Sequence, residues 1–170
     1  MREGAENKEQ NIMPPQRDTT HPDILQIGTF SLDRQLYGVN ILRMREILLP
    51  QDIVRVPRAP RIMEGVINLR GQVIPVVSLR ARMNIPLRPF DKKTRIINME
   101  INDMVVGFLV DSIEHIHIVK SADIQEPPTT LSAGDEDCII GMAQTDDAML
   151  VLLDPDRLVS TDELLEGLKE

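Results

Sequence analysis

The chain has 170 residues, enough for one domain with a sizeable core or for two small domains. Four aromatic residues, no tryptophan and a single cysteine predict an aliphatic core and exclude an internal disulfide or a cysteine-based zinc or iron–sulfur site. The net charge of −8 is unevenly distributed: residues 34–95 carry 13 basic and 4 acidic side chains, and residues 96–170 carry 3 basic and 17 acidic ones.

Two explanations fit this charge pattern. Either each half presents one sign of potential to a different partner, or the halves neutralise each other within one fold. Nucleic acid is not expected as a partner, because the chain lacks aromatic residues for stacking on single strands and any motif that reads a duplex. The longest uncharged apolar run, residues 104–110, is far shorter than the roughly 20 residues that span a bilayer. We therefore expect a cytoplasmic protein that does not insert into membranes and reaches them only through a partner.

The polar residues 1–22 show no apolar period and are interpreted as a disordered N-terminal arm. Residues 23–160 form the predicted domain, and residues 161–170 a C-terminal helix. Short Val- and Ile-rich runs punctuated by Gly and Pro predict an all-β protein. The expected strands are Ile24 to Leu32, Gln35 to Ile41, Glu64 to Asn68, Gln72 to Val77, Arg95 to Ile101, Met104 to Val110, Ile139 to Gln144 and Ala148 to Leu153.

Local signals add a hairpin and three short helices. Gly71 suits a turn position with positive φ, which predicts a hairpin with Arg70 at its tip. Helices are expected at 58–63 and 78–83, where Ser78 can act as an N-cap. Ser160 and Glu163 have capping-box spacing before the terminal helix, and Leu164, Leu165 and Leu168 are expected to share its apolar face.

An internal repeat is the most informative feature of the chain. An offset of 69 residues places Gly38 on Gly107 and aligns seven further apolar pairs, from Ile27 with Ile96 to Ile47 with Ile116. A slightly larger offset aligns residues 65–77 with 141–153. Duplication of a five-strand unit predicts two small barrels, each closed to hide its edges, with a contact groove between them.

No catalytic constellation is found, so an enzyme is not expected. His115 and His117 would share one face of a strand and could bind a metal, but no third ligand is suggested nearby. Cys138 follows an acidic run that disfavours its thiolate, and no glycine-rich phosphate loop is present. No metal or other cofactor is predicted.

Several motifs occur in an order that resembles one known family. They are Tyr37 to Leu42 (YGVNIL), Arg45 to Ile47 (REI), Val56 to Pro60 (VPRAP), Gly65 to Gly71 (GVINLRG), Val73 to Val77 (VIPVV), Val110 to Ile113 (VDSI) and Leu152 to Asp154 (LLD). Over residues 24–160 the sequence is similar to the bacterial chemotaxis coupling proteins of the CheW family. The resemblance implies two SH3-like five-stranded β-barrel subdomains with short helices and a C-terminal helix.

The resemblance also implies a function and a site. The function is a non-catalytic adaptor that couples the cytoplasmic tips of chemoreceptors (methyl-accepting chemotaxis proteins) to the regulatory domain of a chemotaxis histidine kinase. The kinase-binding residues stay unknown. The implied receptor-binding residues are Met44, Glu46, Asn68, Arg70, Gly107, Ile113 and Ile116.

Alternatives stay open at this point. Arg70 can pair with a receptor carboxylate or with Glu46, and the apolar site residues can instead belong to the core. The whole chain can also be a small-molecule or metal-binding regulator that uses the groove or His115 and His117. A third possibility is a structural protein whose basic and acidic halves associate between copies.

Overall fold

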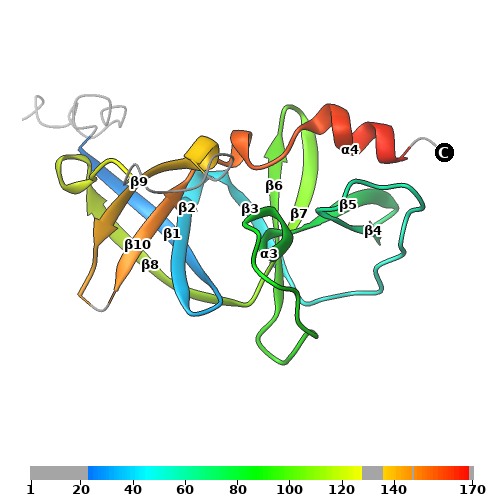
Figure 1. The fold of residues 1–170 in the computed structure, drawn as a ribbon, viewed down its shortest axis with the longest axis horizontal. Helices are drawn as coiled ribbons and strands as arrows, with labels where there is room; N and C mark the ends of the chain where they lie inside the picture. Colours follow the sequence, from blue (N-terminus) through cyan, green and yellow to red (C-terminus); the bar gives the residue numbers. More distant parts are fainter. Residues whose placement is uncertain (1–22, 128–135, 147, 169–170) are drawn as a thin grey trace, which may run out of the picture.

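A computed structural model of the chain describes residues 23–127, 136–146 and 148–168. Its strands are grouped in two five-stranded sheets that lie side by side along the long axis of the molecule (Figure 1). The predicted mostly-β architecture is confirmed. The predicted arm at 1–22 lies outside the described residues.

Sheet A has the strand order β8-β1-β2-β10-β9. Its strands are β1 (Ile24–Leu32), β2 (Gln35–Asn40), β8 (Ser112–Lys120), β9 (Ile139–Gln144) and β10 (Met149–Leu153). Sheet B has the order β3-β6-β7-β5-β4. Its strands are β3 (Met44–Leu48), β4 (Met63–Leu69), β5 (Gln72–Ser78), β6 (Arg95–Ile101) and β7 (Met104–Val110).

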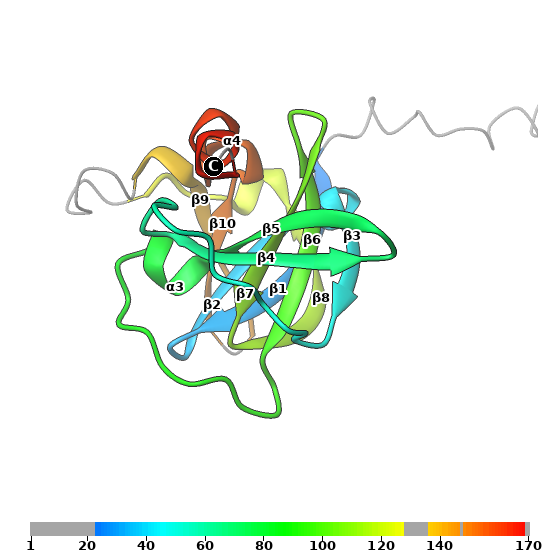
Figure 2. The same cartoon turned by 90° about the vertical axis from the view of Figure 1, so that its right-hand side faces the viewer.

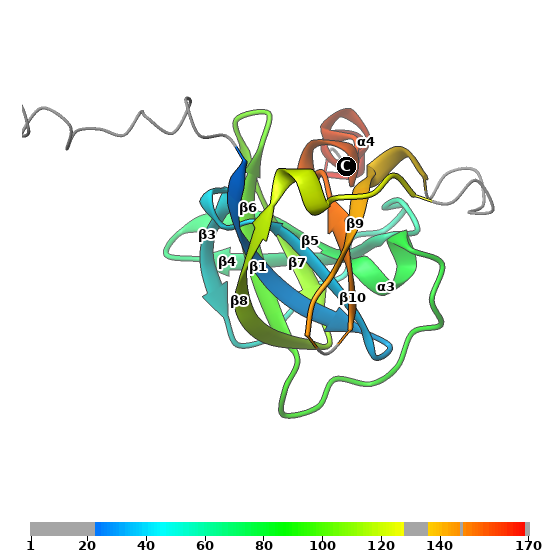
Figure 3. The same cartoon turned by 90° about the vertical axis from the view of Figure 1, so that its left-hand side faces the viewer.

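Each half of the chain contributes one strand to the other half's sheet. After β1 and β2 in sheet A, the chain passes through the 3-10 helix η1 (Ile41–Arg43) and places β3 at the edge of sheet B, beside β6. After β6 and β7 in sheet B, the chain passes Asp111 and places β8 at the edge of sheet A, beside β1 (Figure 3). If β1–β5 are matched in order with β6–β10, the two sheets have the same strand order. An internal repeat predicts such an equivalence.

Three hydrophobic clusters follow from this arrangement. One lies within sheet A, formed by Ile27, Val119, Ala143, Leu150 and Leu152. One lies within sheet B, formed by Ile67, Ile74, Val76, Ile96 and Leu109. The largest joins the two sheets, with Phe30, Leu32 and Val39 from sheet A and Ile97, Phe108 and Val110 from sheet B among its members. The two sheets therefore share one core and belong to one folding unit.

The expected closed barrels are not found in the pairing of the strands. β8 and β9 are the two ends of sheet A, and β3 and β4 the two ends of sheet B. In sheet B the loop that follows β3 pairs with β4 by one bridge, in which Val54 and Val66 exchange two backbone hydrogen bonds of 2.9 Å. Gln125 and Met142 form the equivalent bridge in sheet A.

The remaining elements are short. They are α3 (Leu79–Arg82), η2 (Ser121–Asp123), η3 (Glu136–Cys138), η4 (Pro155–Arg157) and α4 (Thr161–Leu168). Although α4 follows sheet A in the chain, it lies over sheet B (Figures 1 and 2). A Cβ at Gly167 would lie 2.9 Å from Cδ of Pro60, so the small residue allows this close packing.

Local predictions had mixed outcomes. Gly71 has a φ of +85° in the predicted hairpin turn, and the Ser78 hydroxyl accepts a hydrogen bond from the Ala81 N–H at the start of α3. The helix predicted at 58–63 is wrong, because Arg58 has a φ of +65°, which no helix allows. Leu164 is buried in α4, but Leu165 is 49% exposed, since adjacent helical residues point about 100° apart.

Candidate functional site

Polar residues of the predicted site meet where β3 lies near the β4–β5 hairpin. Glu46 of β3 accepts a hydrogen bond of 2.8 Å from the Arg70 guanidinium at the hairpin tip. The exposed Asn68 accepts a hydrogen bond from the Gly71 N–H through its side-chain oxygen and so closes the turn that presents Arg70. The structure thus shows the internal ion pair, while 69% of the Arg70 side chain stays exposed to a partner.

Apolar residues of the predicted site meet at the junction of the two sheets. Gly28 of β1 is the register partner of Ile116 in β8, so both residues face the same side of sheet A. A Cβ at Gly28 would lie 2.7 Å from both Sδ and Cε of Met44, which is on β3 of sheet B. The missing side chain at Gly28 therefore lets Met44 reach across to the row that contains Ile116.

Two other predicted residues lie deeper. Ile113 is the register partner of Phe30 and packs, partly buried, against the core between the sheets. Gly107 is buried in β7, and a Cβ there would lie 2.8 Å from Cγ2 of Ile96 and 3.0 Å from Oδ1 of Asn98. The structure does not bring Gly107 to the surface, so its role is to leave space for its neighbours on β6.

Sequence analysis missed part of this apolar surface. Ile118 is two residues from Ile116 on β8, and Ile24 on β1 is the diagonal neighbour of Ile118. All three therefore lie on one face of sheet A. They are between 56% and 70% exposed. The alternating isoleucines of residues 116–118 are the signal that could have found them. We call Ile24, Ile118, Ile116 and Met44 the apolar row.

The described ion pairs bear on the uneven charge of the chain. Four of them join a basic residue of 34–95 to an acidic residue of 96–170. These pairs are Arg43–Asp156, Arg45–Glu100, Arg80–Asp111 and Arg88–Asp111. Neutralisation of one half by the other within a single fold therefore accounts for part of the charge pattern.

The histidines do not form a metal centre with other described side chains. His115 is exposed and His117 is half-buried on β8. Among the residues that the structure describes, no group of three His, Cys, Asp or Glu could hold a metal ion. His21 lies outside these residues. Within the same limits, no helix has the length and apolar character needed to cross a membrane.

Comparison with known proteins identifies similar chains. Residues 26–163 match the family model described as the CheW-like domain. The chemotaxis protein CheW of Rhizobium meliloti is 32% identical over 138 residues, covering 81% of this chain and 89% of the relative. The chemotaxis protein CheW of Helicobacter pylori is 31% identical over 140 residues, covering 82% of this chain and 84% of the relative.

A solved structure is similar as well. The crystal structure of the scaffolding protein TtCheW from Thermoanaerobacter tengcongensis superposes with a TM-score of 0.74 and 34% sequence identity. The match covers 83% of this chain and 97% of that one.

Proposed function

The chain belongs to the family of CheW-like domains, and from this premise we propose that it is a non-catalytic adaptor in chemotaxis signal transduction. It couples the cytoplasmic tips of chemoreceptors, the methyl-accepting chemotaxis proteins, to the regulatory domain of a chemotaxis histidine kinase. The proposed location is the cytoplasm, where receptor arrays hold the protein at the membrane. The finer prediction that each sheet has an SH3-like architecture belongs to this proposal.

One observation carries the site assignment. The Met44 side chain of sheet B fills the space that Gly28 leaves on sheet A, and Ile116 is the register partner of Gly28 on the same face. An apolar row that crosses a sheet junction and keeps three isoleucines exposed is a feature of protein interaction surfaces. Beside Met44 along β3, the Glu46–Arg70 pair supplies polar groups that can define the orientation of a partner.

We assign the receptor to this surface. Its proposed contacts are Met44, Glu46, Asn68, Arg70, Ile113 and Ile116. Gly107 is buried and contributes indirectly, by leaving space for Asn98. The kinase-binding residues are not assigned. The partly buried Met44 and Ile113 support the surface from the core side, and Ile116, which is 60% exposed, is the apolar residue most available to a partner.

The test of the coupling role is co-sedimentation of the protein and its kinase with receptor-bearing membranes, scored by kinase activity. Arg70→Ala is expected to weaken receptor binding by about 2 kcal/mol, roughly 30-fold, if Arg70 is an interface anchor. Arg34→Ala is the matched control. Arg34 is an exposed arginine in the β1–β2 turn, and its φ of +72° resembles the +52° of Arg70.

The apolar part of the surface has its own variant. Ile116→Asp is expected to abolish co-sedimentation without kinase, because it places a charge in the apolar row. Leu165→Asp, at an exposed leucine of α4, serves as the control. If the wild-type protein neither sediments with receptor membranes nor activates the kinase, the proposed function is wrong. If it does both and these two site variants behave like their controls, only the site assignment is wrong.

A further inference from the structure

Each crossover between the sheets is held by an ion pair. The first crossover is η1, which leads from β2 in sheet A to β3 in sheet B and ends with Arg43. The second is Asp111, which leads from β7 in sheet B to β8 in sheet A. Arg43 pairs with Asp156, and Asp111 pairs with Arg80.

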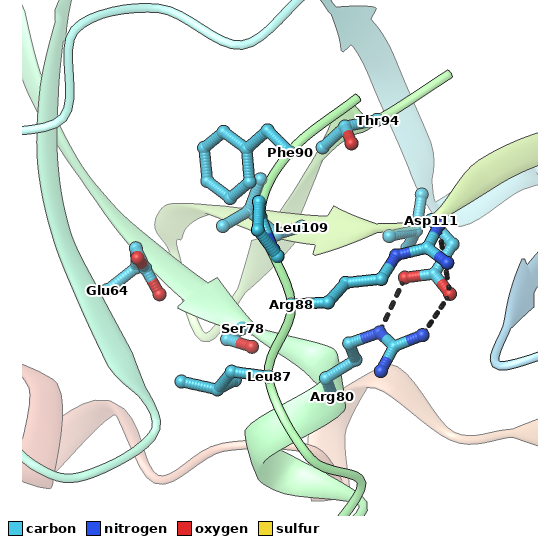
Figure 4. A pocket seen from close by; sticks show the side chains of 11 residues that line it. Glu64, Ser78, Arg80, Leu87, Arg88, Phe90, Thr94, Leu109 and Asp111 are labelled. Atoms are coloured by element: carbon cyan, nitrogen blue, oxygen red, sulfur yellow. Dashed lines mark hydrogen bonds and ion pairs between the residues drawn. The ribbon is translucent and has the colours of Figure 1, made fainter. Parts of the chain in front are cut away.

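The pair at the second crossover is buried. Asp111 accepts two hydrogen bonds of 2.8 Å from Nε and Nη2 of Arg80, on α3 of the sheet B side (Figure 4). It also accepts one of 2.7 Å from the Asp33 N–H, in the β1–β2 turn of sheet A. Burial by itself would raise the pKa of Asp111, but the hydrogen bonds from Arg80 and from the Asp33 N–H keep that pKa below its usual value. One carboxylate therefore connects both sheets while it stays charged.

The pair at the first crossover is more exposed but also connects residues of both sheets. Arg43 donates to both carboxylate oxygens of Asp156, at 2.7 Å and 3.2 Å, in η4 after the last strand of sheet A. It also donates to the Glu100 carbonyl oxygen of β6 in sheet B, at 2.9 Å. The hydrogen bond to Asp156 and the nearby carboxylates raise the pKa of Arg43, although partial burial opposes them. Arg43 thus also connects the two sheets.

The two pairs lie at equivalent crossovers with their charges exchanged, although the offset of 69 matches Asp111 with Leu42, the residue before Arg43. The offset of 76 that aligns Gly65 with Gly141 places Arg80 on Asp156. The offset of 69 places Ser31 on Glu100. The Ser31 carbonyl accepts a hydrogen bond from the Asp111 backbone N–H, and the Glu100 carbonyl accepts one from the Arg43 guanidinium. At the second crossover, Asp111 supplies the carboxylate, and Arg80, in the segment after β5, supplies the guanidinium. At the first crossover, Arg43 supplies the guanidinium, and Asp156, in the segment after β10, supplies the carboxylate.

Both crossovers also lead directly into the proposed receptor surface. Arg43 immediately precedes Met44, and Asp111 lies two residues before Ile113. We propose that Arg43–Asp156 and Arg80–Asp111 are positioning residues for receptor binding: they fix the starts of β3 and β8 and thereby the relative placement of the two sheets. The receptor part of this inference rests on the proposed function.

The test separates placement of the sheets from binding. Spin labels at the exposed Gln72 of sheet B and Gln144 of sheet A, in a Cys138→Ala background, report the distance between the sheets. Asp156→Arg places two guanidiniums opposite each other, and is expected to broaden that distance distribution and to weaken receptor binding at least tenfold. Combining Asp156→Arg with Arg43→Asp restores opposite charges and is expected to restore both measurements in part. The Glu100 carbonyl, which now accepts from Arg43, would face a carboxylate, but water can reach this more exposed site.

The same reversal at the second crossover is expected to fail. In Arg80→Asp with Asp111→Arg, the Asp33 N–H would face a guanidinium and the Pro86 carbonyl, which now accepts from Arg80, would face a carboxylate. The folded fraction of each variant is checked by circular dichroism, so that binding is compared among folded proteins. Rescue at the first crossover distinguishes positioning by charge from a loss of packing, which reversed charges would not repair.

Three outcomes contradict the inference. An unchanged distance distribution in Asp156→Arg overturns it whatever the receptor does. A broadened distribution with unchanged receptor binding overturns the positioning role. If the wild-type protein does not bind receptors at all, the proposed function and the receptor part of the inference fail together, and the distance measurement still decides whether the ion pairs place the sheets.

Discussion

Sheets A and B have the same strand order, but equivalent positions in them have unequal surroundings. At the second crossover the side chains of Arg80 and Asp111 are 10% and 11% exposed, whereas those of Arg43 and Asp156 at the first are 31% and 52% exposed. The two halves of the chain thus correspond in the pairing of their strands and in having an ion pair at each crossover. The energy of each position depends on how much water the packing of the two sheets leaves around it.

The largest expected effect comes from removing Asp111. Asp111→Ala leaves the Arg80 guanidinium buried without its carboxylate, which costs about 3–5 kcal/mol of stability. Asp156→Ala is the matched control at the first crossover, where an exposed pair contributes about 0–1 kcal/mol. Chemical denaturation measures the free energy of unfolding of both variants. Equal losses would show that burial does not distinguish the two crossovers.

The next effect concerns the equivalent glycines, Gly38 and Gly107. A Cβ at Gly38 would lie 2.4 Å from Cγ2 of Ile27, and one at Gly107 would lie 2.8 Å from Cγ2 of Ile96. Alanine at either position overpacks its sheet and is expected to cost about 1–3 kcal/mol, with Gly38→Ala the more destabilising.

A second substitution checks this explanation. Ile27→Leu removes the Cγ2 methyl and is expected to recover part of the stability that Gly38→Ala loses; Ile96→Leu does the same for Gly107→Ala. Thermal or chemical denaturation of the single and double variants gives the coupling free energy. If neither leucine couples to its alanine, steric contact at Cγ2 is not the cause.

A smaller effect is expected in the dependence of stability on pH. Hydrogen bonds from Arg80 and Asp33 lower the pKa of Asp111 against the opposing effect of burial, and a hydrogen bond from Arg43 lowers that of Asp156. A carboxyl whose pKa is lower in the folded state contributes stability above its unfolded pKa, here 3.8, and this contribution disappears as the pH falls through the folded pKa. Acidification below about pH 4 is therefore expected to destabilise the wild type.

Asn at each position tests which carboxyl dominates. Asp111→Asn lowers stability at pH 7 and is expected to flatten the acid limb of the stability profile more than Asp156→Asn does. Denaturation curves between pH 3 and pH 7 measure this difference. A profile of Asp111→Asn that runs parallel to that of the wild type would refute the assignment.

The smallest expected effect is on the stability of the hairpin tips. Arg70→Ala removes an exposed ion pair with Glu46 and should cost under about 1 kcal/mol. Arg34→Ala, at the second residue of the turn between β1 and β2, removes no ion pair among the described residues and should cost less still. Thermal denaturation compares the two. A loss of several kcal/mol in Arg70→Ala would mean that Arg70 acts mainly in folding.

Much of the secondary structure was predictable because its signals are local. The predicted bounds of β1, β6, β7 and β9 agree with the structure, and those of β2, β4, β5 and β10 differ by one or two residues at most. The two strands that were not among the expected ones are β3 and β8. Both are exposed edge strands that carry charged or histidine side chains, so the alternation that identifies half-buried strands is weak in them.

The candidate site was predictable in part. Glu46 and Arg70 pair as one of the two alternatives expected, although β3 and β4 are the opposite ends of sheet B. Ile24 and Ile118 were missed because β8 was not among the expected strands, so its pairing with β1, which puts them on one face, was not expected either. Gly107 was expected at the surface, but its strand lies between β6 and β5 in the interior of sheet B.

The sequence by itself determined the hairpins, their turns and the correspondence between the halves, because apolar alternation and positive-φ positions act over a few residues. Only the tertiary structure decided that β3 and β8 exchange sheets, that Met44 fills the space over Gly28 beside the row of Ile116, and that Asp111 is buried against Arg80. The physical reason is that each of these depends on groups distant in the chain, whose approach is set by burial of the shared core between the sheets and by no local preference.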